Sequence, residues 1–178
     1  MSPVAAPRPW HDARMRLVDT LRTRLRAPLE KLVAAEVARQ VEAQKLDALY
    51  KYRWHGDRSR LHIPETAVVN NALFNVSGGE ITLGEYVFFG HDVAILTGTH
   101  DIEKFGLERQ MTFPRSGRDV VIGDGVWLAS HVLVLGPVTI GEHSVVAGGS
   151  LVREDIEPYT VVAGRPAKVV KKIVPPTS

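Results

Sequence analysis

The sequence contains no cysteine. Without a thiol the chain cannot form a disulfide, a thiolate metal site or a cysteine acyl-enzyme, so a covalent cysteine intermediate is excluded. The sequence also lacks any apolar run that approaches the roughly 18 residues of a membrane-spanning helix, which predicts no membrane span. The first residues, MSPVAAPRPWHDAR, contain no apolar stretch after a positive start. We therefore expect no secretory signal and a cytoplasmic location.

Neither sign of charge dominates, since the formal net charge is only +2. The distribution is uneven, however: residues 1–60 carry +6, residues 61–152 carry −6 and residues 153–178 carry +2. The arginines of the first segment are interspersed with acidic and apolar residues in a helical pattern. Such a pattern is typical of a solvated helix face and not of a nucleic-acid surface. We predict no nucleic-acid partner.

Apolar residues recur at helical spacing in the first part of the chain. Between about Asp12 and Tyr52 they lie three to five positions apart, which predicts an amphipathic helical segment within residues 1–60. Proline is tolerated at the first position of a helix and disfavoured inside one. Pro28 therefore predicts two helices, the second beginning near Pro28 and running towards Tyr50. We expect the apolar stripe to pack on the rest of the chain or on a partner subunit.

A period of six residues replaces the helical period after Leu61. Each repeat begins with an apolar, mostly aliphatic, residue and has a small or branched residue at its fifth place. Such repetition predicts a parallel β-helix, in which three repeats close one triangular coil. A β-sandwich does not fit, because its strands have a period of two. The clearest repeats, from residue 122 to residue 157, are IGDGVW, LASHVL, VLGPVT, IGEHSV, VAGGSL and VREDIE.

The same period occurs upstream in LGEYVF and FGHDVA, and it is interrupted at residues 101–119. We therefore predict a mainly β protein of three parts. An N-terminal helical segment occupies residues 1–60, and a β-helix with a loop insertion at 101–119 occupies residues 61–168. A C-terminal tail follows at residues 169–178.

These motifs resemble the hexapeptide-repeat acyltransferase family, in particular its galactoside, maltose and xenobiotic acetyltransferases. The most specific segments are HDVAILTGTHD at 91–101, the repeats from Ile122 to Val152, and VVAGRPAKVVKKI at 161–173. The resemblance implies a left-handed parallel β-helix, a homotrimer and active sites in the clefts between subunits. The left hand follows from the family alone, because parallel crossovers are otherwise right-handed.

The resemblance also implies that His100 is the catalytic base of an acetyl-CoA-dependent O-acetyltransferase. The chemistry agrees, because the acceptor hydroxyl must lose a proton while its oxygen attacks the thioester. An imidazole with the ordinary pKa of about 6.5 can accept that proton at neutral pH. Direct transfer of this kind needs neither a metal nor a covalent intermediate. We predict that the acceptor is a hydroxyl of a sugar or glycan.

The same resemblance assigns residues to acetyl-CoA, the expected co-substrate. Trp127 matches a family tryptophan beside the cofactor. Ser130 and Gly148 match positions that line the pantetheine groove, where small side chains let an extended chain lie close to the backbone. The phosphates of CoA need cationic partners. We expect four basic residues near the last coil to supply them: Arg153, Arg165, Lys168 and Lys171.

The acceptor side resembles the family less closely. Counting back from His100 places Asn70 where galactoside-type enzymes have an acceptor-binding asparagine, but Gly78 stands where they have an aspartate. Met111 matches a loop residue near the acceptor. The predicted substrate-binding residues are therefore Asn70, Asn71 and Met111. Polar residues that could serve a differently shaped acceptor are Asn71, Asn75 and Glu80.

Three other functions remain open. The nearest is N-acetylation of an amino sugar or of an antibiotic. A non-catalytic β-helix scaffold would have no use for His100, Trp127 and the closing basic motif. A zinc carbonic anhydrase of the same fold needs three converging histidines, with a close His-x-x-x-x-His pair. The sequence has no such pair, and we predict no metal.

Overall fold

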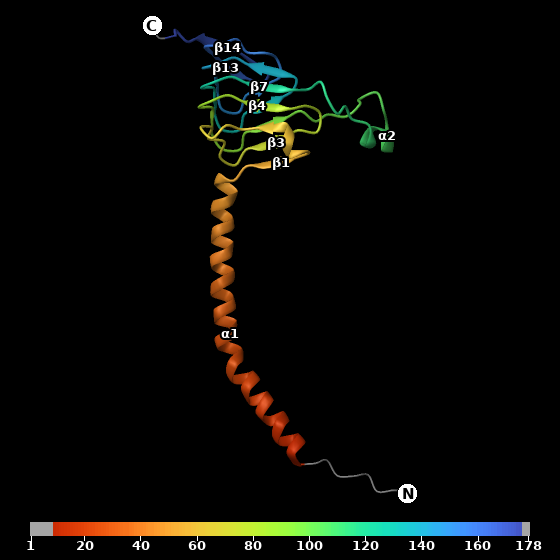
Figure 1. Ribbon diagram of the computed structural model, residues 1–178, viewed down its shortest axis with the longest axis vertical. Helices are drawn as coiled ribbons and strands as arrows, with labels where there is room; N and C mark the ends of the chain where they lie inside the picture. The colour runs from red at the N-terminus through yellow and green to blue at the C-terminus, as the bar shows by residue number, and fades with distance from the viewer. Residues whose placement is uncertain (1–8, 176–178) are drawn as a thin grey trace. The chain divides into compact units, whose positions relative to one another are not determined.

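The structure is a computed structural model that describes residues 9–175. The chain divides into two compact units, Met1–Leu46 and Asp47–Ser178. Almost all of helix α1, which spans Pro9–Tyr50, belongs to the first unit, and a stack of short strands forms the second (Figure 1). Among the described residues, no helix is both long enough and apolar enough to cross a membrane.

Helix α1 is continuous, so the prediction of two helices is wrong. Pro28 lies in its interior, and Figure 1 shows no break in the helix. An interior proline removes one backbone hydrogen bond and costs roughly 3 kcal/mol. Here the sequence on both sides is rich in Ala, Leu, Glu and Arg, which favour a helix strongly enough to continue it. The apolar side chains of its described part are exposed in the single chain: Leu25, Leu29, Leu32, Val33, Val37 and Val41.

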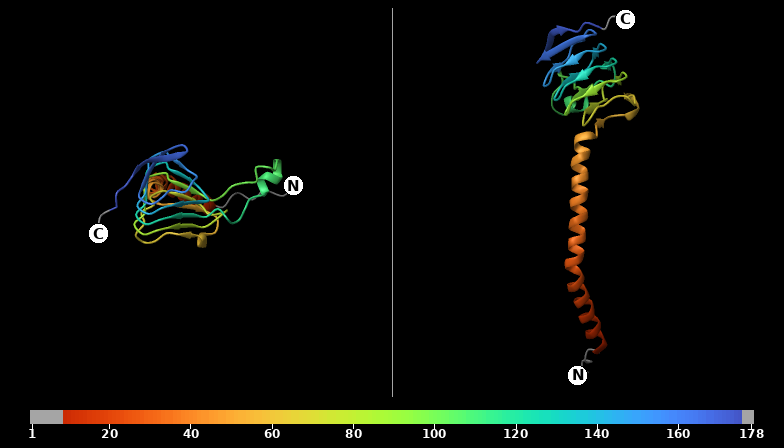
Figure 2. Two further views of the ribbon diagram at one scale, coloured as in Figure 1. Left: turned by 90° about the horizontal axis from the view of Figure 1, so that it is seen from above. Right: turned by 90° about the vertical axis from the view of Figure 1, so that its left-hand side faces the viewer.

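The second unit is a parallel β-helix, in which successive coils stack and their strands form three sheets, one on each face (Figure 2). Face A has the order β1 (Arg53–His55), β3 (Leu73–Asn75), β6 (Ala94–Leu96), β9 (Leu133–Leu135) and β12 (Leu151–Val152). Face B contains β2 (Leu61–His62), β4 (Ile81–Leu83), β7 (Val120–Ile122) and β10 (Val138–Ile140). Face C contains β5 (Phe88–Phe89), β8 (Trp127–Leu128), β11 (Val145–Val146), β13 (Thr160–Gly164) and β14 (Ala167–Lys172). Only β14 pairs antiparallel among these strands.

Successive coils are in register at a step of 18 residues wherever the repeat is regular. Trp127 pairs with Val145, for example, 18 positions further along the chain. The step from Phe88 to Trp127 is 39 residues, because that coil contains the predicted insertion after His100. The insertion includes a short helix, α2 (Gly106–Met111), with no buried residue. It therefore leaves the stack without changing the register of the coils around it.

The hydrophobic core consists of the two repeating positions of the hexapeptide. Every first and fifth residue of the six blocks is at most 8% exposed, as the repeat predicted. Two of the fifth positions are serines, and both are hydrogen-bonded, which removes the cost of burying a hydroxyl. Ser144 Oγ donates to the carbonyl of Glu157, and Ser150 Oγ accepts from the backbone N–H of Gly164 at 3.1 Å.

The sheets extend beyond the range 61–168 at both ends. Strand β1 precedes residue 61 and already pairs with β3 on face A. Strand β14 continues to Lys172 as the antiparallel partner of β13. All three residues of β1 are exposed, so no alternation of buried and exposed residues marks this strand in the sequence. A short 3₁₀ helix, η1 (Arg58–Arg60), connects β1 to β2.

Candidate active site

His100 lies just after β6, where the chain leaves the stack to form the insertion. Its Nδ1 is 3.0 Å from the carbonyl oxygen of Arg109. Because a carbonyl can only accept, the neutral ring carries its hydrogen on Nδ1 and has a free lone pair on Nε2. The exposed imidazole also meets the ring of Phe113 edge to face, with the centroids 6.0 Å apart. In this geometry Nε2 is the ring nitrogen that can accept a proton.

The side chain of Arg109 ties the insertion together. Its Nε donates to the carbonyl of Lys104 at 2.5 Å, and a terminal nitrogen donates to the carbonyl of Ile102 at 3.1 Å. The guanidinium also lies 5.0 Å from the centroid of Phe105, within the range of a cation–π contact. The Arg109 side chain thus ties the end of the loop, where its own carbonyl faces His100, back to the start of the loop.

His100 opens on a hollow of about 260 Å³ at the end of the face A strands. His55 and Asn75 come to this hollow from β1 and β3, where they are paired in register. Asn75 was one of the predicted alternatives, whereas His55 and Ser77 were not predicted. The lining residues are His55, Asn75, Ser77, Gly98, Thr99, His100 and Phe113. Among the side chains that the structure describes, no three His, Asp or Glu are grouped as a metal site.

The residues predicted to bind the substrate do not line this hollow. Asn70 and Asn71 form the turn before β3, at the opposite end of face A from His100. Their side chains bond to the next coil: Asn70 Nδ2 donates to the carbonyl of Phe89 at 2.7 Å, and Asn71 Nδ2 donates to Asp92 Oδ1 at 2.8 Å. Met111 ends α2 with 68% of its surface exposed. Within one chain none of the three joins His100.

Trp127, Ser130 and Gly148 lie together on face C and at its corner with face A. Trp127 is 42% exposed and stacks on Phe88, with the ring centroids 5.6 Å apart and the planes at 14°. Ser130 Oγ accepts from the backbone N–H of His91 at 3.1 Å. A Cβ at Gly148, one coil further, would lie 3.2 Å from the carbonyl oxygen of Ser130. A side chain at Gly148 would therefore crowd this corner.

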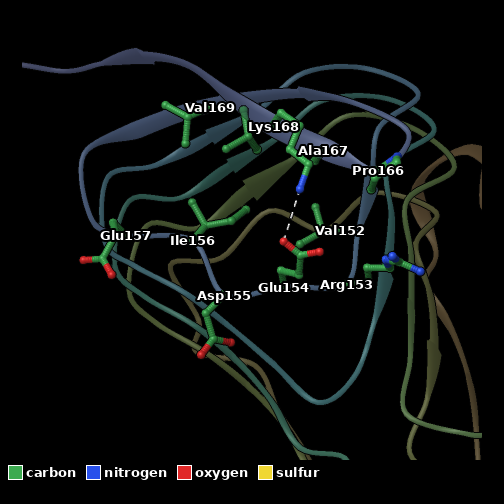
Figure 3. A pocket seen from close by; sticks show the side chains of 11 residues that line it. Val152, Arg153, Glu154, Asp155, Ile156, Glu157, Pro166, Ala167, Lys168 and Val169 are labelled. Atoms are coloured by element: carbon green, nitrogen blue, oxygen red, sulfur yellow. Dashed lines mark hydrogen bonds and ion pairs between the residues drawn. The ribbon is translucent and has the colours of Figure 1, made fainter.

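The predicted basic residues border this region near the last coil. Arg165 donates to the carbonyl of Gly149 at 3.2 Å, beside Gly148. Lys171 is paired with Val161, which continues the register of Val145 and Trp127 on face C. Arg153 and Lys168 line a second hollow of about 230 Å³. Figure 3 shows Lys168 reaching across it to Glu154, with Nζ 3.3 Å from Oε2.

Known proteins match parts of this chain. The family described as bacterial transferase hexapeptide (six repeats) matches residues 119–154. Galactoside O-acetyltransferase of Escherichia coli K12 is 35% identical over 119 residues, which cover 65% of this chain and 55% of that enzyme. The chain spans little more than half the length, 55% to 57%, of the curated relatives that it matches.

Solved structures show the same fold. The polysialic acid O-acetyltransferase OatWY has a TM-score of 0.53 at 27% identity, over 66% of this chain and 56% of its own. AntD, an N-acyltransferase from Bacillus cereus, has a TM-score of 0.54 over 78% of this chain and 90% of its own, and at 11% identity it supports the fold alone. The predicted left-handed parallel β-helix is confirmed by these likenesses together with the stacked parallel sheets. The chain is thus similar to the hexapeptide-repeat family of bacterial transferases and to acetyltransferases that match more of its length.

Proposed function

We propose that this protein is an acetyl-CoA-dependent O-acetyltransferase that acts on a hydroxyl of a sugar or glycan, with His100 as the general base. The observation that carries the proposal is the state of the imidazole. Nδ1 is engaged by the carbonyl of Arg109, and Nε2 is free beside a polar hollow. Two of the similar proteins, the galactoside and polysialic acid enzymes, are O-acetyltransferases of saccharides.

The reaction is a direct transfer. Nε2 of His100 takes the proton of the acceptor hydroxyl while the hydroxyl oxygen bonds to the thioester carbon of acetyl-CoA. The tetrahedral intermediate then expels the CoA sulfur, and the C–S bond breaks. The proton on Nε2 returns to the departing thiolate, so the products are the acetyl ester and CoA with its thiol restored. During both proton movements the carbonyl of Arg109 stabilises the imidazolium through Nδ1–H.

Acetyl-CoA is assigned to the surface that carries Trp127, Ser130 and Gly148. Phe88 and Trp127 expose a flat aromatic stack, and the small residues at the neighbouring corner leave room for the narrow pantetheine arm. Lys171 and Arg165 lie at the end of this surface towards the last coil, where the CoA phosphates would find cationic partners. The Trp127 surface and His100 lie at opposite ends of face A in one chain.

This separation supports the proposal that the protein acts as a homotrimer with sites shared between neighbouring copies. The base of one copy would then face the Trp127 surface of the next. Variants His100→Ala and Trp127→Ala, each impaired alone, are expected to restore part of the turnover when they are coexpressed. Some mixed sites then contain both native residues. We would measure acetyl transfer by the purified mixture; a mixture no more active than its separate variants contradicts a shared site.

We expect Lys168 to give up its ion pair with Glu154 and to bind a phosphate of CoA instead. Their ion pair is exposed on both sides, at 66% and 61%, and such a pair contributes only about 0–1 kcal/mol. Lys168→Ala should therefore raise the KM for acetyl-CoA by roughly three- to tenfold with kcat unchanged. Lys45→Ala is the matched control, since Lys45 is 67% exposed and lies 3.3 Å from Glu42 on α1. Steady-state kinetics with equal KM values for both variants would remove Lys168 from the site.

The proposed function is tested by acceptor-dependent release of thiol from acetyl-CoA. The panel contains neutral sugars, amino sugars and antibiotics, and mass spectrometry of the acceptor identifies the acetylated product. Cleavage of the product by hydroxylamine distinguishes an ester from an amide. We expect an ester on a sugar hydroxyl. A stable amide would replace the proposal by N-acetylation, and an absence of acceptor-dependent thiol release would favour a scaffold.

A further inference from the structure

We propose that Asn75, Ser77 and His55 form the acceptor subsite beside His100, and that this subsite binds a single neutral, polyhydroxylated ring. The inference rests on the function proposed above, because it takes His100 as the base. It assigns the acceptor to the hollow at the end of face A and not to the Asn70–Asn71 turn. Four observations support it: an oriented amide, a glycine floor, the register of β1 and the absence of charge from the lining.

Asn75 presents a free donor to the hollow. Its Oδ1 accepts from the backbone N–H of Ser77 at 2.9 Å and from the Ser77 hydroxyl at 2.6 Å. A backbone N–H can only donate, so the amide oxygen must face it, and this fixes the orientation of the side chain. Nδ2 then keeps two hydrogens that no described residue accepts. An acceptor hydroxyl beside the reacting one is a suitable partner for them.

Gly98 leaves the space in which these two polar groups lie. A Cβ at this position would be 2.6 Å from Ser77 Oγ and 2.7 Å from Asn75 Nδ2. Both separations are shorter than van der Waals contact, so any side chain here would push the two groups out of place. Because Gly98 precedes His100 by two residues, the same turn positions the base and accommodates the amide.

His55 lines the hollow on the same side as Asn75. It is paired in register with Asn75 on the neighbouring strand, and its side chain is exposed to the hollow. On the other side Phe113 supplies an aromatic ring, which suits the C–H face of a sugar. The hollow thus combines hydrogen-bonding groups with one apolar wall.

The lining favours a neutral ligand of limited size. None of its seven residues is Asp, Glu, Lys or Arg, so this lining offers no counter-charge to a charged substituent of the acceptor. The volume of about 260 Å³ is below the roughly 300–1,000 Å³ of pockets that hold drug-sized ligands. Both features favour one sugar ring over an antibiotic, an amino sugar or an acidic sugar.

The test replaces only the free donor. Asn75→Asp keeps an Oδ1 that accepts from Ser77, but it removes both Nδ2 hydrogens and adds a negative charge. The probes are D-glucose, D-glucosamine and D-glucuronate, which offer a similar ring in neutral, cationic and anionic forms. We expect the wild type to use glucose with the highest kcat/KM. In the variant the KM for glucose should rise by about tenfold or more, with the KM for acetyl-CoA unchanged and the preference shifted towards glucosamine.

Asp57→Asn is the matched control. Asp57 Oδ1 accepts from the N–H and hydroxyl of Ser59 at 3.0 and 2.8 Å, the same turn as at Asn75, but Asp57 does not line the hollow. Its glucose KM should stay within twofold of wild type. An unchanged KM in Asn75→Asp overturns the subsite, and it leaves the proposed function standing if His100→Ala is still inactive. A wild-type preference for either charged sugar, or turnover of none of the three, overturns the neutral-ring assignment.

Discussion

His100→Ala should lower kcat by about 10²- to 10⁴-fold, which corresponds to roughly 2.7–5.4 kcal/mol of transition-state stabilisation. The loss is expected because Nε2 removes the acceptor proton, and no other imidazole or carboxylate of the hollow donates to the carbonyl of Arg109. The affinity for acetyl-CoA should be unchanged, since the imidazole acts on the acceptor. Single-turnover kinetics and calorimetric titration with acetyl-CoA separate the two quantities.

His62→Ala provides the control for this variant. His62 is also an exposed histidine of the β-helix, with 50% of its side chain accessible, but it lies on face B with its Nε2 3.4 Å from Glu80. Its removal should leave kcat within twofold of wild type. Turnover within threefold of wild type for His100→Ala would remove the base from the mechanism, whatever the control shows.

Phe74→Ala should have the largest effect on stability. Phe74 is fully buried on β3, with its ring edge to face against Tyr52 at 5.8 Å and 6.3 Å from the ring of Phe89. Truncation leaves a cavity that the narrow coil cannot fill. We expect a loss of about 3–5 kcal/mol, or roughly 6–20 °C in Tm. Urea and thermal denaturation followed by circular dichroism at one fixed protein concentration measure both.

Phe105→Ala is the comparison for the buried phenylalanine. Phe105 lies in the insertion and is 77% exposed, so its truncation removes the same atoms without opening a cavity. Its free energy of unfolding should stay within about 0.5 kcal/mol of wild type. Equal stability of the two variants would show that the interior of the coil does not depend on Phe74.

The repeat made most of the β-helix predictable. A period of six places the first and fifth residues of each block inside, and those residues are the buried ones from Ile122 to Ile156. The prediction was weaker where the period is not constant. The step is 20 residues from Arg53 to Leu73 and 21 from Leu73 to Ala94, whereas it is 18 in the regular coils. Counting along the repeat therefore could not bring His55 and Asn75 to the same wall.

The remaining differences have local causes. Helix α2 was not predicted. The insertion that contains it has no repeat, and the helix buries no residue, so neither a period nor an apolar face indicated a helix there. The break predicted at Pro28 rested on a steric rule that applies to one position, and the helix preference of the surrounding residues outweighed it. His100 itself was assigned by resemblance, and its link to Arg109 depends on a loop conformation that residue types do not determine. The roles of the predicted site residues stay predictions.

The antiparallel strand β14 has a consequence for how the protein behaves at high concentration. A stack of parallel coils ends in a row of unpaired backbone groups, and such an edge can template another chain in the way that fibrils grow. Here the chain reverses after Gly164 and covers the edge of β13 with its own last strand. The new outer edge carries Lys168, Lys171 and Lys172, and lysines on an edge strand repel an incoming copy. The last edge of face C is thereby protected against fibre formation.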